Sequence, residues 1–105
     1  MRKDAVTPEL HDHVVRRDGM CFIFFVNRGH VCRDQWGTEH SAFALGKLTV
    51  DHVHDVPGGV RGKRAPSDMR HLVAMCANAN IGGPSREVRR LEREYLTKLY
   101  EGEVV

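Results

Sequence analysis

Asp51 and His52 are adjacent in the chain, and His71 and Asn80 follow them across a segment rich in glycine and basic residues. A carboxylate and an amide oxygen suit a hard divalent cation such as Mg²⁺ or Mn²⁺. A neutral imidazole beside them is a natural general base, because its unperturbed pKa of about 6.5 leaves it deprotonated above neutral pH. The pattern predicts a cation site with a base beside it. The alternative is a half-buried polar pair on a strand, without chemistry.

Two short apolar segments are expected to position these side chains. Residues 48–53 alternate between apolar and polar types, which predicts a strand, and residues 72–76 form a second apolar run of strand length. Adjacent strand residues point to opposite faces unless the strand ends or bulges. Because Pro57-Gly58-Gly59 follows closely, we expect Asp51 and His52 to turn toward one site. Residues 77–81 predict one helical turn that carries Asn80, for which a helix C-cap is the alternative role.

The remaining segments complete an α+β chain. Thr7-Pro8-Glu9 is typical of a helix start and Asp18-Gly19 of a helix end, so a helix is expected over residues 8–17. Residues 20–26 are continuously apolar and predict a buried strand, and residues 27–46 predict a long loop pinned by its aromatic residues. Ser85 predicts the cap of a last helix over residues 85–100. The apolar face expected for that helix consists of Val88, Leu91, Tyr95 and Leu99.

Composition limits the class of protein. The chain has 105 residues, of which 41% are hydrophobic, so it is expected to form one domain over residues 1–105 with a core over about residues 16–83. No apolar run approaches the roughly 20 residues of a membrane helix, and the first residues do not read as a signal peptide. Three cysteines, an odd number, argue against a secreted disulfide framework. A reduced, cytoplasmic setting is therefore expected.

The net charge of +2 conceals a local excess of positive charge. Residues 57–71 carry four basic side chains against one acidic side chain, which gives a local net charge of +3. Basic residues of this kind bind phosphates without reading sequence. The candidates are Arg61, Lys63, Arg64 and Arg70, joined by Arg90 and Arg93 of the last helix. For the helix, the alternative is a solvated face on which Glu87, Glu92 and Glu94 pair with the arginines.

The order of these motifs resembles a known enzyme family. Leu-Thr-Val-Asp-His-Val over residues 48–53, Arg-His-Leu-Val-Ala-Met-Cys over residues 70–76 and then Asn80 are similar to the HNH endonucleases of the ββα-metal, or His-Me finger, fold. Residues 16–21, 32–37 and 64–73 resemble the versions found in phages of actinobacteria. The resemblance implies a ββα-metal core and hydrolysis of phosphodiester bonds in double-stranded DNA with one Mg²⁺ or Mn²⁺. It also implies a role in phage genome processing or packaging, with terminase subunits as candidate partners.

The resemblance assigns a role to each residue of the motif. His52 matches the general base, Asp51 the first metal ligand and Asn80 the last motif residue, which also binds metal. His71 stands where the family has the asparagine that orients the catalytic histidine. A structural histidine is the alternative.

The cysteines depart from the family pattern. Many HNH domains hold a zinc ion with two Cys-x-x-Cys pairs. Here the second cysteine of each pair is replaced, by Phe24 after Cys21 and by Ala79 after Cys76. Cys32 is a candidate third thiolate, with His30 or another histidine as the fourth ligand. The alternative is that all three cysteines are small buried hydrophobic residues. Two rival functions remain open: a non-catalytic DNA-binding or packaging module, and a zinc-stabilised interaction domain.

Overall fold

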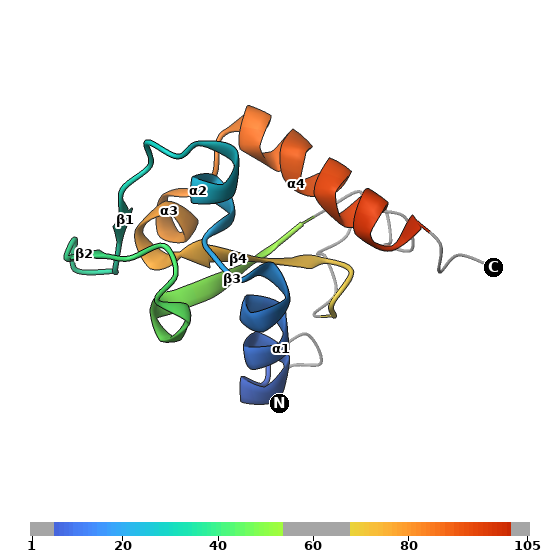
Figure 1. The fold of residues 1–105 in the computed structure, drawn as a ribbon, viewed down its shortest axis with the longest axis horizontal. Helices are drawn as coiled ribbons and strands as arrows, with labels where there is room; N and C mark the ends of the chain where they lie inside the picture. Colours follow the sequence, from blue (N-terminus) through green and yellow to red (C-terminus); the bar gives the residue numbers. More distant parts are fainter. Residues whose placement is uncertain (1–5, 54–67, 102–105) are drawn as a thin grey trace.

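The computed structural model describes residues 6–53 and 68–101 as a mixed α+β structure (Figure 1). Two antiparallel two-stranded sheets, β1–β2 and β3–β4, are surrounded by helices. No helix within the described residues is both long and apolar enough to cross a membrane. In chain order the elements are α1 (Pro8–Asp18), α2 (Phe22–Val26), β1 (Cys32–Arg33), β2 (Glu39–His40), η1 (Leu45–Lys47), β3 (Leu48–His52), β4 (Leu72–Cys76), α3 (Ala77–Gly82) and α4 (Arg86–Leu99).

The central unit is the β3–β4 pair followed directly by α3. Both strands form where the sequence predicts them, and the register pairs Leu48 with Cys76 and His52 with Leu72. Every residue of β4 is buried, because α1 and α2 both contact this strand. The predicted helical turn is also confirmed, since α3 begins immediately after β4 and packs against β3. Within the described residues, β3, β4 and α3 thus follow one another in the chain, and α3 begins directly after β4.

The segment at residues 20–26 is a helix and not the buried strand that its composition predicts. Phe25 N–H donates to the Cys21 carbonyl at 3.0 Å and Asn27 N–H donates to the Ile23 carbonyl at 2.8 Å, which is helical bonding. Only Phe22 of this helix is fully buried, whereas Phe25 is 50% exposed. A short apolar run does not by itself distinguish a strand from a helix. Among the described residues, side chains already bond to the outer edge of β4, and packing of one side of the segment on β4 favours the helix.

Side chains from the end of α1 and from the segment that follows cover the outer edge of β4. Arg17 donates to the Leu72 carbonyl at 2.6 Å, Asp18 accepts from Ala74 N–H at 2.8 Å, and the Cys21 thiol accepts from Cys76 N–H at 3.3 Å. These three polar groups of β4 are therefore satisfied by side chains, which cover this edge of the strand. These contacts fix β4 against the end of α1, where the sequence predicts a helix end at Asp18-Gly19.

The predicted loop over residues 27–46 contains the small β1–β2 hairpin. Asp34 closes its turn by accepting from Trp36 N–H and Thr38 N–H, both at 2.9 Å, and Gly37 adopts a positive φ of +85°. Trp36 is 80% exposed, so the expectation that aromatic residues pin this segment is wrong for the tryptophan. The hairpin is held instead by strand pairing and by backbone bonds to Asp34.

The last helix, α4, begins as predicted but buries a different set of residues. Ser85 caps it by accepting from Val88 N–H at 3.2 Å. Leu96 and Glu92 are the fully buried residues, whereas Leu99 is 43% exposed. The apolar face expected from the sequence was therefore wrong at its C-terminal end. The face that contacts the core runs through Val88, Glu92 and Leu96, with Leu96 packed among Phe22, Val53 and Val73.

Candidate functional site

Four potential metal ligands converge at the junction of α2, β1 and β4. One ligand atom from each of Cys21, His30, Cys32 and Cys76 lies within 4.8 Å of the other three. Cys21 precedes α2, His30 and Cys32 lie just before and at the start of β1, and Cys76 ends β4, so the four come from three separate parts of the chain. The three cysteines are buried and the histidine is half-buried. This cluster could hold a metal ion.

Hydrogen bonds already join the members of this cluster. His30 Nε2 lies 3.4 Å from Cys76 Sγ. The Cys21 thiol and His30 lower the pKa of Cys76, because both hydrogen-bond to its sulfur. Donation to Cys76, together with burial, raises the pKa of Cys21, and burial raises that of Cys32. Cys76 is thus the thiol best prepared to become a thiolate, which is the form that binds metal.

Three thiolates and one imidazole are a donor set that zinc takes in closed structural sites. Bonds of about 2.0–2.3 Å to a tetrahedral ion place ligand atoms roughly 3.8 Å apart, so separations within 4.8 Å need only small side-chain adjustments. The predicted zinc ligands were these three cysteines with His30 or another histidine, and the structure brings the three cysteines together with His30. Phe24 and Ala79, at the second positions of the Cys-x-x-Cys pairs, pack against the hydrophobic cluster that includes the three cysteines.

The second group of candidate residues lies on the β3–β4–α3 unit. Asp51 and His52 both lie within β3, opposite Val73 and Leu72, so the pleat directs their side chains to opposite faces of the sheet. The expectation that Asp51 and His52 turn toward one site therefore does not match the side-chain directions of this regular strand. Asp51 is only 7% exposed, whereas His52 is half-buried.

Asn80 joins α3 to the Asp51 face of β3. Its Nδ2 donates at 2.9 Å to both Thr49 Oγ1 and the Val50 carbonyl. Thr49 and Asp51 are two residues apart on a strand and therefore share a face. The helix continues to Gly82, and Gly83 has the positive φ of +80°, so Asn80 is not the C-cap. Its amide nitrogen fixes the helix, and its amide oxygen remains an acceptor beside the Asp51 face.

His71 is a buried connector between the two strand ends. Its carbonyl accepts from Val53 N–H at 2.7 Å, and its Nδ1 lies 2.6 Å from Asp68 Oδ1, which also accepts from Arg70 N–H at 2.9 Å. Its Nε2 is buried and has no hydrogen-bond partner among the described residues. These contacts order the chain as it enters β4, next to the position of His52.

Glu92 is a residue of this site that the sequence analysis missed. The expectation that it lies on a solvated face is wrong, because it is 0% exposed. Burial and the neighbouring Asp51 carboxyl raise its pKa to about 10, against the opposing effect of Arg89 and Arg93. Its position four residues after Val88 and four before Leu96 places it on the apolar stripe of α4. That spacing was the available signal, and the charge of the residue obscured it.

The predicted phosphate-binding residues fall into three groups. Arg61, Lys63 and Arg64 lie outside the described residues. Arg90 is exposed and pairs with Glu87 and, at 2.7 Å, with Glu94, so the expected pairing of those two acids is confirmed. Arg70 and Arg93 are half-buried, and the Arg70 guanidinium lies 5.4 Å from the ring centre of Tyr100.

Comparison with protein-family models, with curated proteins and with solved structures gives no match for this chain.

Proposed function

We propose that this protein is a metal-dependent endonuclease or nickase of the HNH type that acts on double-stranded DNA. The observation that carries the proposal is the β3–β4–α3 unit, which places the buried carboxylate of Asp51 and the amide of Asn80 against one face of β3. Asp51 Oδ2 is buried without a hydrogen-bond partner among the described residues, so it suits a cation. A role in phage genome processing or packaging, alongside a terminase, belongs to the same proposal.

Each residue of the unit has a role in the proposed reaction. Asp51 and Asn80 would hold Mg²⁺ or Mn²⁺ with oxygen ligands. Such an ion stabilises the charge that develops on phosphate oxygens in the transition state. His52 would remove the proton of the attacking water, a contribution of roughly 10²–10⁴-fold in rate. This role requires the His52 side chain, at the last residue of β3, to reach around the strand end to the Asp51 face. His71 is a positioning residue, because its contacts order the chain beside His52.

Affinity for DNA would come from basic side chains and not from base readout. Arg70 and Arg93 remain candidates, whereas Arg90 would first have to leave its two glutamate partners. Arg61, Lys63 and Arg64 stay in the proposal on their sequence pattern alone.

A second candidate function is a zinc-stabilised module that binds DNA or protein without cutting. The cluster of Cys21, His30, Cys32 and Cys76 favours it, because such a site can serve folding alone. Under the nuclease proposal the same zinc is structural and joins α2, β1 and β4. The two candidates therefore share the zinc and differ only in what the β3–β4–α3 unit does.

A plasmid nicking assay tests the nuclease proposal. Zinc-loaded protein is expected to relax supercoiled DNA when Mg²⁺ or Mn²⁺ is added, and His52→Ala is expected to stop this. His13→Ala, at an exposed position of α1, is the matched control and should cut normally. A wild-type protein that shifts the plasmid on a gel but leaves it intact with either cation would support the non-catalytic module.

A further inference from the structure

Glu92 of α4 and Asp51 of β3 form a pair of buried carboxyl groups. Glu92 is 0% exposed and Asp51 is 7% exposed, and the Asp51 carboxyl lies close enough to raise the pKa of Glu92. Two carboxylates cannot share such a site while both are charged, unless something positive lies between them. The residues come from elements about 40 positions apart in the chain, so the fold creates this contact.

Three oxygen atoms of the pair lack hydrogen-bond donors. Asp51 Oδ2 and both Oε atoms of Glu92 are buried, and no donor among the described residues reaches them. A single proton shared by the carboxyl groups would join only two of the three oxygens. A divalent cation accepts oxygen ligands from both groups at once, which offsets both charges and leaves fewer oxygens unsatisfied.

The surroundings of the pair favour an oxygen-liganded cation. Arg89 and Arg93 are close enough to act on Glu92 through their charge, yet neither gives it a hydrogen bond among the described contacts. Asn80 lies against the same face of β3 as Asp51 and keeps an amide oxygen available as a further ligand. Carboxylate and amide oxygens together suit Mg²⁺ or Mn²⁺ better than zinc.

We propose that Glu92 is a direct ligand of the divalent cation, supplied by α4 from outside the strand–strand–helix unit that carries Asp51 and Asn80. The inference rests on the proposed function for the identity of the site and extends it by one ligand. It also gives α4 a role beyond packing, because the helix must be docked, with Leu96 packed against Val53 and Val73, before the cation site is complete.

Binding of Mn²⁺ alone to zinc-loaded protein tests this inference, with the loss of the free-ion electron paramagnetic resonance signal as the readout. Wild type is expected to bind one Mn²⁺ per chain. Glu92→Gln keeps the shape and removes the charge, and it should weaken binding by at least about ten-fold, the lower end of the loss seen even for outer-shell partners. Glu94→Gln, an exposed position on the same helix, is the matched control and should bind as wild type does.

Zinc content and circular dichroism report whether each variant is folded, independently of Mn²⁺. If Glu92→Gln does not fold, Glu92→Leu replaces it, because an apolar residue is readily accommodated at a buried position. Wild-type affinity in the folded variant, or no Mn²⁺ binding by wild type, would overturn the inference. Failure of the nuclease proposal looks different: wild type binds Mn²⁺, Glu92→Gln does not, and neither cuts plasmid DNA.

Discussion

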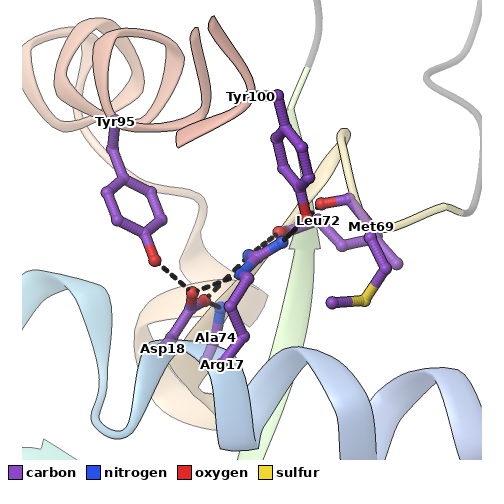
Figure 2. Close-up of polar contacts among 7 residues, drawn as sticks. All are labelled: Arg17, Asp18, Met69, Leu72, Ala74, Tyr95 and Tyr100. Carbon is purple, nitrogen blue, oxygen red and sulfur yellow. Dashed lines mark hydrogen bonds and ion pairs between the residues drawn. The ribbon is translucent and has the colours of Figure 1, made fainter. Parts of the chain in front are cut away.

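The phenol of Tyr95 donates a 2.6 Å hydrogen bond to Asp18 Oδ1, and this bond joins α4 to the end of α1 (Figure 2). Asp18 also accepts from Ala74 N–H of β4 and pairs with Arg17 at 2.7 Å. The Arg17 guanidinium extends the network to the Leu72 carbonyl and the Tyr100 hydroxyl (Figure 2). One partly buried group of polar side chains therefore holds both terminal helices to the same strand.

Tyr95→Phe is expected to destabilise the protein by about 1.5–3 kcal/mol, because it removes a hydrogen bond to a charged group and leaves the ring in place. Urea unfolding of zinc-loaded protein measures the change. Thr97→Ala is a control on the same helix, because Thr97 is exposed. A Tyr95→Phe midpoint equal to that of wild type would mean that the bond contributes nothing to stability.

Alkaline titration should reveal Tyr95 separately. Burial and donation to Asp18 raise the pKa of Tyr95 above its ordinary value of about 10. A raised folded-state pKa gives stability that is fully present below the unfolded pKa and is lost as pH rises toward the folded value. Above about pH 10, the unfolding free energy of wild type should therefore fall more steeply with pH than that of Tyr95→Phe. Parallel curves for the two proteins would contradict the assignment.

If the cluster of Cys21, His30, Cys32 and Cys76 holds zinc as proposed, the bound ion should protect all the thiols. The chain has three cysteines, and all three lie in the cluster, so zinc-loaded folded protein should react slowly with a thiol reagent. Removal of the metal with a strong chelator should expose three thiols per chain and lower the thermal midpoint, because metal binding is coupled to folding. Cys32→Ser is expected to lose zinc, measured by elemental analysis. Rapid modification of three thiols with zinc still bound would contradict the site.

Local patterns were sufficient for much of the fold. The cap at Thr7, the alternation over residues 48–53 and the cap at Ser85 each encode their element within a few residues. Residues 20–26 carry no such local signal, because a short apolar run fits either a strand or a helix. The choice of a helix depends on packing against β4, whose residues lie some 50 positions later in the chain.

The residues of the candidate site differ in the same way, because some could be predicted from residue type and others depend on the packing of distant elements. The zinc cluster could be proposed from residue types, but the choice of His30 depends on how β1 is placed beside β4. Glu92 was misassigned, because a glutamate among arginines is typical of a solvated face. Its burial is decided by the docking of α4 against Phe22, Val53 and Val73, which no local pattern encodes.

Asn80→Asp separates the structural role of Asn80 from its proposed role as a ligand. The substitution removes the Nδ2 donor that holds both Thr49 Oγ1 and the Val50 carbonyl and places a charged oxygen against that carbonyl. In the absence of divalent cation, we expect a loss of about 2–4 kcal/mol in the free energy of unfolding, since two bonds break and an acceptor meets an acceptor. Asn78→Asp, at an exposed position of the same helix, is the matched control and should change stability little.

Urea unfolding without and with Mn²⁺ measures both effects. Because a carboxylate is the stronger ligand for Mn²⁺, the cation should restore part of the lost stability in Asn80→Asp but not alter Asn78→Asp relative to wild type. Equal responses of the two variants to Mn²⁺ would show that position 80 does not contact the cation.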